Sequence, residues 1–465
     1  MHQSLLGRLD LVHHTTSEEP LSARPSSVRG APLFALLPPA LLQNLDSRSK
    51  VQPKHWRSTG AVLSIDVSGS SALAERLGAS ESYGAEDLAR HLTEVFDPLI
   101  AGIQRHGGEV EQFAGDNILA VWDNSERGLN ANVQAAVACA GDIQAQWKEL
   151  QSANSQPLQL RMGVGSGYIW RAIAGGASGR YFYLLGGAAV CRAQQVEDRA
   201  PVSGILLSDE VVARIEPVVQ MAEGFCAQVR RSEPVLENLS ATPVERSLSP
   251  EVLQSFLPNA VHDPAASGDR WLSEFRRVQI VFADLGAGDD SHVFDPRLDE
   301  RISLIQESVS STGGSIQQFA IEHGQHTMLA CWGLAGESYE DDVDRSLRSA
   351  LALNSVLVST GATGSVGVAR GRVFCGYRGN ASRREYAVIG SAVNQAARIM
   401  QRADGLVVCD EFSRAGSTVG CSFESSGTIK LRGFDKPVAS HRVHSGRTPR
   451  GDVDAEGLLG RNEEL

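Results

Sequence analysis

The chain has 465 residues, of which 42% are hydrophobic and 21% charged, and its formal net charge is −12. This length allows two or three domains with substantial cores, and the composition is that of a soluble globular protein. The acidic balance argues against nucleic acid or an anionic membrane as the main partner. The seven cysteines show no CxxC or other paired spacing, and we expect reduced thiols in a cytoplasmic protein. No apolar run has the length of a membrane span, and the start of the chain lacks a signal-peptide pattern.

Residues 1–32 are rich in Ser, Pro, Arg and His without a sustained period, so we predict disorder there. Residues 33–45 are apolar enough to pack as one short lead-in helix. From residue 60 to 207, apolar periodicity predicts a sheet covered by helices. The expected strands are 61–66, one on each side of 115–117, 158–165, 167–174, 181–185 and 205–207, and the expected helices are 70–77, 84–105, 129–150 and 188–199.

After a proline-containing connector at 208–270 the pattern returns. Phe113 and Phe319 begin matching motifs 206 positions apart, and Gly186 and Gly390 end matching strands 204 positions apart. A repeat of this length is a duplicated domain, which we assign to residues 33–207 and 271–445. Two such copies can pair face to face and form a site at their interface.

The first copy carries two acidic turns. Asp66 ends an apolar strand and is followed by the small residues Ser68, Gly69, Ser70 and Ser71 at a predicted helix start, where backbone N–H groups can bind phosphate. Asp116 lies in a predicted hairpin turn, and if that hairpin borders the first strand the two carboxylates converge, as two-metal phosphoryl chemistry requires. Taken alone, the Asp66 turn could instead be a plain helix cap, and the Asp116 turn could be a backbone turn.

The second copy carries a complementary pair. Asn394 and Arg398 are four positions apart and share one face of a predicted helix, where an amide could hold a sugar and a guanidinium could meet phosphate charge. A solvated helix face is the alternative. The corresponding positions of the first copy are Val190 and Gln194. The halves are therefore complementary, which predicts one active and one degenerate site.

Four motifs in this order resemble those of the class III nucleotidyl cyclases, and among them the soluble, bicarbonate-responsive adenylyl cyclases with tandem catalytic domains. They are Asp66-Val67-Ser68-Gly69, Phe113-Ala114-Gly115-Asp116, Tyr386-Ala387-Val388-Ile389-Gly390 and Val393-Asn394-Gln395-Ala396-Ala397-Arg398. The resemblance implies an α+β fold of two ferredoxin-like βαββαβ domains, associated head to tail as a pseudo-twofold heterodimer within one chain.

The resemblance also implies roles for residues. Asp66 and Asp116, with the Val67 carbonyl, would hold two Mg²⁺ ions, with Mn²⁺ or Ca²⁺ as alternatives. Residues 67–71 and Arg161 would bind phosphates. Asn394 would position the ribose, and Arg398 would stabilise the transition state.

The chain departs from the family at two places. The base-recognition positions hold Gln318 and Ala387 in place of a Lys and a Thr or Asp, so purine choice is less secure than catalysis. At the bicarbonate site, Gln112 replaces a Lys and Arg192 lies one position away from the family's Arg. The loss of one fixed cation predicts reduced bicarbonate activation.

The sequence therefore predicts an adenylyl cyclase that converts ATP to 3′,5′-cyclic AMP and pyrophosphate at one interdomain site. A guanylyl or mixed-purine cyclase and a catalytically inactive cyclase-like regulatory module are the alternatives. Residues 446–465 resemble a linker to an NTPase module, which predicts that the chain is a fragment or a truncated product.

Overall fold

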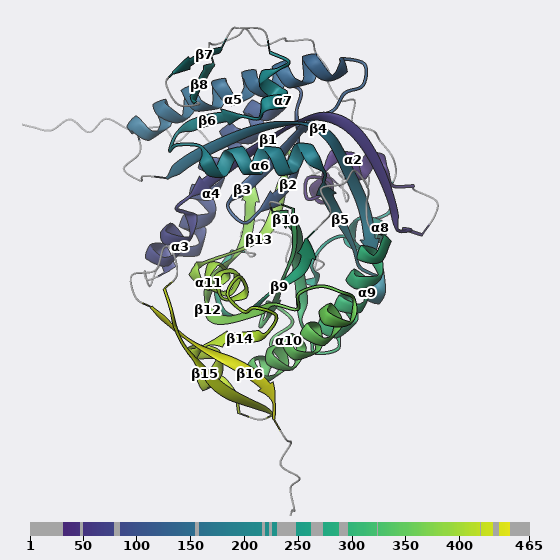
Figure 1. Ribbon diagram of the computed structural model, residues 1–465, viewed down its shortest axis with the longest axis vertical. Helices are drawn as coiled ribbons and strands as arrows, with labels where there is room; N and C mark the ends of the chain where they lie inside the picture. The colour runs from purple at the N-terminus through teal and green to yellow at the C-terminus, as the bar shows by residue number, and fades with distance from the viewer. Residues whose placement is uncertain are drawn as a thin grey trace, which may run out of the picture.

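The computed structural model describes residues 31–46, 50–78, 84–153, 158–215, 219–222, 226–229, 248–261, 273–287, 296–322, 324–418, 420–430 and 437–446. The two larger sheets, each covered by helices, lie one above the other in Figure 1. We call residues 54–207 the first half and residues 274–445 the second half. The predictions for residues 1–30 and 447–465 lie outside the described residues.

The first half has the strand order β2-β3-β1-β4-β5, with β6 pairing in parallel with β4. Its central strand β1 is buried on both faces, because Leu63 and Ile65 join the main core cluster while Val62 packs on the opposite side. The elements are β1 (Lys54–Ser68), α3 (Ser70–Gly78), α4 (Gly84–Arg105), β2 (Glu109–Ala114), β3 (Asn117–Trp122), α5 (Gly128–Ala153), β4 (Gln159–Gly175), η2 (Ala177–Gly179), β5 (Tyr181–Gly186), α6 (Ala188–Arg199) and β6 (Gly204–Leu207).

The predicted strands 158–165 and 167–174 are one continuous strand, β4, so their separation was wrong. Gly167 suggested a turn, and it does have a φ of +140°. It nevertheless stays in register opposite Gly60 of β1, so the strand bends there without ending.

The second half repeats this topology. Its strand order is β10-β11-β9-β12-β14-β16-β15, with β13 pairing with β12 and β14 parallel to β12. The duplicated ferredoxin-like α+β fold predicted from the sequence is confirmed. The elements are β9 (Glu274–Ala287), α9 (Pro296–Ser310), β10 (Ser315–Glu322), β11 (Gln325–Trp332), α10 (Asp342–Ser359), β12 (Val366–Gly379), β13 (Arg384–Ile389), α11 (Ser391–Met400), β14 (Val407–Asp410), α12 (Glu411–Gly416), β15 (Cys421–Ile429) and β16 (Val438–Ser445). Along the chain, the first half is followed by α7 (Asp209–Val212), β7 (Val219–Ala222) and β8 (Cys226–Val229).

The predicted single helix at 33–45 is two short helices, α1 (Ala31–Phe34) and α2 (Pro39–Gln43). Pro38 and Pro39 interrupt it, because proline disfavours a helical residue before it and removes a hydrogen-bond donor. We call residues 31–45 the first lead-in segment.

A second lead-in segment, residues 248–261, repeats the first inside the predicted connector, with α8 (Pro250–Gln254) and η3 (Asn259–Val261). The turn bonds from Leu37 to Phe34 and from Leu257 to Gln254 correspond at an offset of 220 residues. Four identities between the two segments, Leu33/Leu253, Leu37/Leu257, Pro38/Pro258 and Ala40/Ala260, were too few to reveal this repeat.

Each half extends a hairpin over the other. The β4–β5 tip lies against α9, where the Gly175 amide donates to Asp299 at 2.8 Å. The β12–β13 tip lies against α4, where Asn380 donates to Asp97 at 2.9 Å. These reciprocal contacts hold the two halves in a pseudo-twofold arrangement.

The lead-in segments pair with the same hairpins. The Tyr181 amide donates to the Ser255 carbonyl at 2.7 Å, and the Arg384 amide donates to the Ala35 carbonyl at 2.8 Å. Each lead-in segment therefore binds the hairpin of the other copy. Both segments also share one hydrophobic cluster with strands of the second half.

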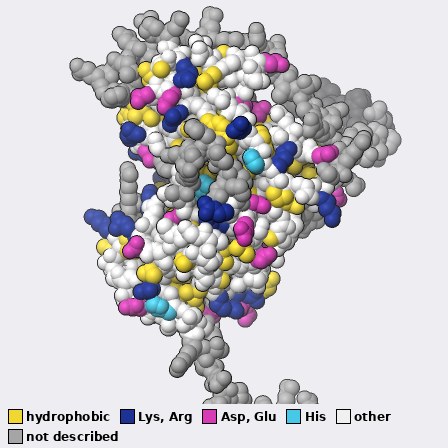
Figure 2. Space-filling view, turned by 45° about the vertical axis from the view of Figure 1, so that its right-hand side comes forward, with side chains coloured by type: hydrophobic (Ala, Val, Ile, Leu, Met, Phe, Trp, Pro, Cys, Tyr) yellow, Lys and Arg dark blue, Asp and Glu magenta, His cyan; other side chains and the backbone are white. Residues whose placement is uncertain are grey.

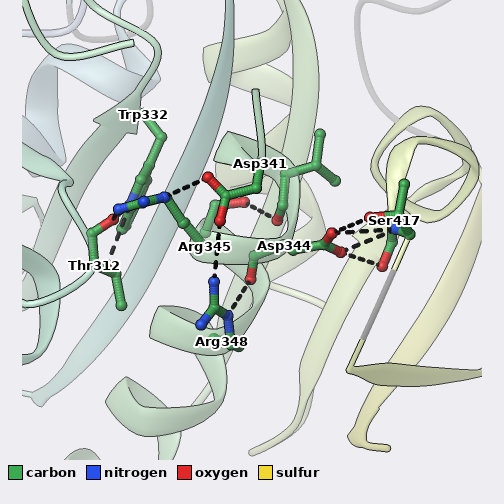
Figure 3. A network of polar contacts seen from close by, with 10 residues as sticks. Thr312, Trp332, Asp341, Asp344, Arg345, Arg348 and Ser417 are labelled. Atoms are coloured by element: carbon green, nitrogen blue, oxygen red, sulfur yellow. Dashed lines mark hydrogen bonds and ion pairs between the residues drawn. The ribbon is translucent and has the colours of Figure 1, made fainter. Parts of the chain in front are cut away.

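A polar network fixes α10 at its N-terminal end (Figure 3). Arg345 donates to Asp341 at 2.6 Å and to the Thr312 carbonyl at 3.4 Å, which links α10 to the turn between α9 and β10. Buried Asp344 accepts hydrogen bonds from Ser417 and Thr418, which links α10 to the segment after α12. The network thus holds α10 against its neighbours within the second half.

Acidic and basic side chains are intermingled over the described part of the face shown in Figure 2. No helix in the described part of the chain is both long and apolar enough to cross a membrane. Six cysteines are free thiols, as predicted: Cys139, Cys191, Cys331, Cys375, Cys409 and Cys421.

The second lead-in segment should contribute to stability as a core element does. Leu253 is fully buried at 0% exposure, so we expect Leu253→Ala to lower the free energy of unfolding. The expected loss in urea unfolding is about 2–5 kcal/mol. Val358→Ala is the matched control, because that side chain is 56% exposed on α10. Its effect should stay within about 0.5 kcal/mol, and equal losses for both variants would contradict the assignment.

Candidate active site

Asp66 and Asp116 lie side by side at one end of the first sheet. Asp66 in β1 is opposite Asn117 of β3, and the Val67 amide donates to the Asp116 carbonyl at 3.1 Å. Gly115 has a φ of +56°, a conformation that glycine adopts readily, and this lets β2 reverse into β3 at that point. The structure therefore brings the predicted pair of carboxylates together.

The turn after Asp66 contacts both carboxylates. Gly69 has a φ of +113°, which lets the chain leave β1 and enter α3 within one residue. The Ser68 hydroxyl donates to Asp66, and the Ser70 hydroxyl donates to Asp116. The serines predicted to bind phosphate thus hold the carboxylates in this structure.

Burial raises the pKa of both Asp66 and Asp116, and the negative charge of Asp66 further raises the pKa of Asp116. Arg161 acts in the opposite direction on Asp66, with its Nη1 atom 3.8 Å from the carboxylate. Two adjacent carboxylates with incomplete charge compensation fit a hard divalent cation. Within the described residues, no group of three or more His, Cys, Asp or Glu side chains is arranged to hold a metal. Mg²⁺ in nucleotide sites commonly takes only one or two protein carboxylates, with substrate and water as its other ligands.

Asn394 of α11 reaches the first half. Its Nδ2 atom donates to the Ser71 hydroxyl at 3.1 Å, so the second half contacts the turn that follows Asp66. Arg398 lies one helical turn further on, is exposed, and donates to Gln401 at 2.9 Å. Of the predicted residues, Asn394 and Ser71 therefore meet across the interface, whereas Arg398 binds Gln401 directly after its own helix.

Two residues beside the carboxylates were missed. Glu197 of α6 is buried at 5% exposure and accepts a hydrogen bond from Asn117 at 3.2 Å. Burial, with help from the Asp66 charge, raises the pKa of Glu197 to about 8. Arg378 of β12 donates to the Gly115 carbonyl, next to Asp116. Glu197 follows Gln194 by three residues and lies on the same face of α6, so the sequence contains a signal for it. Nothing in the sequence relates Arg378 to Gly115.

The glutamines preceding the two Phe-Ala motifs form a reciprocal contact across the interface. The Gln112 side-chain amide donates to the Phe319 carbonyl at 3.1 Å, and that of Gln318 donates to the Phe113 carbonyl at 2.5 Å. Ala387, the other predicted base-recognition residue, is 6% exposed and packs in the core cluster of the first half.

The two residues of the predicted anion site have different partners. Gln112 is buried against β10, and its Oε1 atom has no hydrogen-bond partner among the residues that the structure describes. Arg192 donates to the Ser166 carbonyl at 2.9 Å and pairs with Glu210 of α7 at the same distance. Arg192 is therefore bound within the first half, and no described contact joins it to Gln112.

Comparison with known proteins supports the resemblance found in the sequence, although no family model matches the chain. Adenylate cyclase type 10 of Oryctolagus cuniculus is 26% identical over 401 residues, which cover 77% of this chain and 25% of the rabbit protein. The human protein of the same name is 26% identical over 405 residues, which cover 78% of this chain and 25% of that protein. The chain thus spans about a quarter of the length of these curated relatives.

Among solved structures, a class III adenylyl cyclase-like ATP-binding protein from Pseudomonas aeruginosa matches with a TM-score of 0.54 and 16% identity. The match covers 78% of this chain and 86% of that one, so it includes both halves of the fold. The chain is thus similar in sequence to adenylate cyclase type 10, and its fold is similar to that of a class III adenylyl cyclase-like protein. The resemblance predicted from the four motifs is thereby confirmed.

In this chain, side chains of the protein fill the position related to the candidate site by pseudo-symmetry, and we call it the closed position. Gln194, the counterpart of Arg398, donates to the Ile321 carbonyl at 2.9 Å. Trp170 packs edge-on against His326 beside it, with ring centroids 6.3 Å apart. Asp284, the counterpart of Asp66, accepts bonds from its own turn and from Thr363. Side chains of the protein thus occupy the second position.

A cavity of about 110 Å³ lies between β2 and β10, and both lead-in segments line it. Pockets for drug-sized ligands measure about 300–1,000 Å³, so a nucleoside triphosphate would not fit inside this one. Its lining includes Gln112 and Gln318 but neither Asp66 nor Asp116, so it is not the space between the two carboxylates.

Glu197 should make stability depend on pH in the metal-free protein. Its carboxyl keeps a proton in the folded state up to about pH 8, whereas the unfolded chain releases it near the ordinary pKa of 4.5. Folding stability should consequently fall as pH rises from about 4.5 to 8, and Glu197→Gln should flatten this slope. Urea unfolding with EDTA at pH 5, 6.5 and 8 measures it. Glu126→Gln, at an exposed position, is the control, and equal slopes for both variants would contradict the expectation.

Proposed function

We propose that the chain is an adenylyl cyclase that converts ATP to 3′,5′-cyclic AMP and pyrophosphate at a single interdomain site. The observation that supports this most is the hydrogen bond of 3.1 Å from Asn394 to Ser71. It joins the amide of one half to the turn that carries the carboxylates of the other half. A site divided in this way can form only when the halves are paired.

The residues can be given roles from their positions. Asp66 and Asp116, with the Val67 carbonyl, would bind two Mg²⁺ ions, and Mn²⁺ or Ca²⁺ are alternatives. When bound, the metal would neutralise triphosphate charge and favour loss of the ribose 3′-hydroxyl proton. The backbone N–H groups at the start of α3, together with Arg161, would hold the phosphates.

The second half would orient the substrate. Asn394 would hold the ribose so that its 3′-oxygen is in line with the α-phosphorus, and its bond to Ser71 would keep that amide beside the phosphate turn. Arg398 would stabilise the charge that develops on the phosphates, after exchanging its bond to Gln401 for the substrate.

Gln318 could contact a purine base in two ways. Its Nε2 atom donates one N–H to the Phe113 carbonyl, which leaves its second N–H and its Oε1 atom for a ligand. The oxygen would accept from the 6-amino group of adenine, whereas the second N–H would donate to the 6-oxo group of guanine. We favour the contact with adenine, and ATP as the substrate, because the curated relatives are named adenylate cyclase.

A second candidate is a cyclase-like module that binds nucleotide without turnover. The bond between Arg398 and Gln401 favours it, because that guanidinium is turned to its own helix. The matching Pseudomonas aeruginosa structure is described as a cyclase-like ATP-binding protein, which is compatible with this candidate. The presence of both carboxylates with Asn394 and Arg398 favours catalysis.

We further propose a cytoplasmic location, consistent with the free thiols, and the domain limits 33–207 and 271–445. Weak activation by bicarbonate remains a prediction, which the engagement of Arg192 by Glu210 supports.

Replacement of a metal-binding carboxylate should abolish product formation. We expect Asp116→Asn to lower cyclic AMP production from ATP with Mg²⁺ by at least about a hundredfold. Asp284→Asn is the control, since Asp284 is the counterpart of Asp66 in the closed position. It should retain activity within about threefold, and ATP binding without any product in the unmodified chain would favour the non-catalytic module.

Removal of the Gln318 amide should reduce purine discrimination. We expect Gln318→Met to lower the ratio of kcat/KM for ATP to that for GTP by about tenfold, because one base contact is lost. Gln112→Met removes the matching interface bond at the closed position, so it should disturb the interface similarly without changing the ratio. An unchanged ratio in Gln318→Met would contradict the role of this residue.

A further inference from the structure

Arg378 crosses from the second half into the candidate site. Its side chain is only 4% exposed, and its Nη1 atom donates to the carbonyl of Gly115, the residue directly before Asp116. Gly115 has a left-handed backbone conformation, so the orientation of the Asp116 carboxylate depends on how this turn is held. A residue from one half thereby fixes an acidic turn in the other.

The guanidinium of Arg378 is held on several sides. Its Nε and Nη2 atoms donate to Glu385 of β13 at 3.2 and 2.7 Å. It also lies 5.0 Å from the ring centre of Phe113 and 5.7 Å from that of Phe96. Glu385 offsets the positive charge, so repulsion of a nearby cation is reduced while the hydrogen bond to the turn remains.

The closed position shows what Arg378 replaces. There the counterpart of the Gly115 carbonyl is that of Ile321, and Gln194 of α6 binds it at 2.9 Å. The counterpart of Arg378 is Ala174, which has no donor in its side chain. In the candidate site, Arg378 reaches from β12 and binds the Gly115 carbonyl. Arg398, the counterpart of Gln194, therefore does not have to bind this carbonyl.

We propose that Arg378 is a positioning residue that orders the Gly115–Asp116 turn for metal binding and makes this order depend on docking of the second half. Because it takes the turn carbonyl, it also leaves Arg398 available for substrate phosphate. This inference rests on the proposed role of Asp116 as a metal ligand.

The test is Mn²⁺ binding to the full chain without nucleotide, followed by the electron paramagnetic resonance signal of free Mn²⁺. We expect Arg378→Met to raise the apparent Kd about tenfold, the effect of losing one charged hydrogen bond to the turn. With nucleotide present, the half-saturating Mg²⁺ concentration should rise as well.

Arg383→Met is the matched control. Arg383 is 6% exposed, lies 5.0 Å from the same Phe113 ring, and donates to the Val110 and Glu111 carbonyls across the same interface. No described hydrogen bond connects it to Gly115 or Asp116. It should lower thermal stability and leave the Mn²⁺ Kd within about twofold of the unmodified chain.

Wild-type Mn²⁺ affinity in Arg378→Met would overturn the inference, and so would equal weakening in both arginine variants in proportion to lost stability. If Arg378→Met does not fold, Arg378→Lys serves in its place, because a lysine keeps the charge but has one nitrogen where the arginine uses three to contact Glu385 and Gly115. Asp116→Asn separates the two proposals: if it leaves Mn²⁺ binding unchanged, the proposed metal site itself fails. If it abolishes binding that Arg378→Met preserves, only the role of Arg378 fails.

Discussion

The structure depends on the contact between β2 and β10, the two strands that meet on the pseudo-twofold axis. Gln112 and Gln318 each donate to the Phe carbonyl of the opposite strand. Buried carbonyls require hydrogen-bond partners, so these bonds fix the distance and register between the halves. Asp116 follows Phe113 by three residues, and a shift at this contact would therefore move the candidate site.

The candidate site and the closed position lie on either side of this symmetric contact and differ in their side chains. At one, Gln194, Trp170 and His326 fill the space between helix and strand. At the other, short side chains follow Asp66, and Arg378 binds the turn carbonyl from the side. Duplication supplies two equivalent positions at the interface. A few substitutions close one of them, while the other keeps its acidic groups accessible to a ligand.

The charges of the candidate site explain why it is suited to a cationic ligand. Asp66, Asp116 and Glu197 converge in a partly buried region, and burial raises the pKa of each. Packing alone would not favour such a cluster, because desolvated like charges repel one another. Nearby serine hydroxyls and Arg161 compensate in part, and a divalent cation would complete the compensation.

The reciprocal hairpins and lead-in segments explain how a site divided between two halves can be held together. Each lead-in segment pairs with the hairpin of the other copy, as Ser255 does with Tyr181. Separation of the halves would expose backbone groups and apolar surface on both sides at once. Correct pairing is therefore coupled to folding of the interface.

The sequence by itself determined the duplicated fold, most helices and strands, and the acidic turns, because these follow from apolar periodicity and from glycine at positions needing unusual backbone angles. It also indicated that Asn394 and Arg398 share a helix face. Only the tertiary structure decided that β4 continues through Gly167, that residues 248–261 repeat the lead-in segment, and that Glu197 and Arg378 border the carboxylates. These features depend on contacts between residues distant in the chain, such as the 263 positions from Gly115 to Arg378, and local sequence patterns carry no record of such contacts.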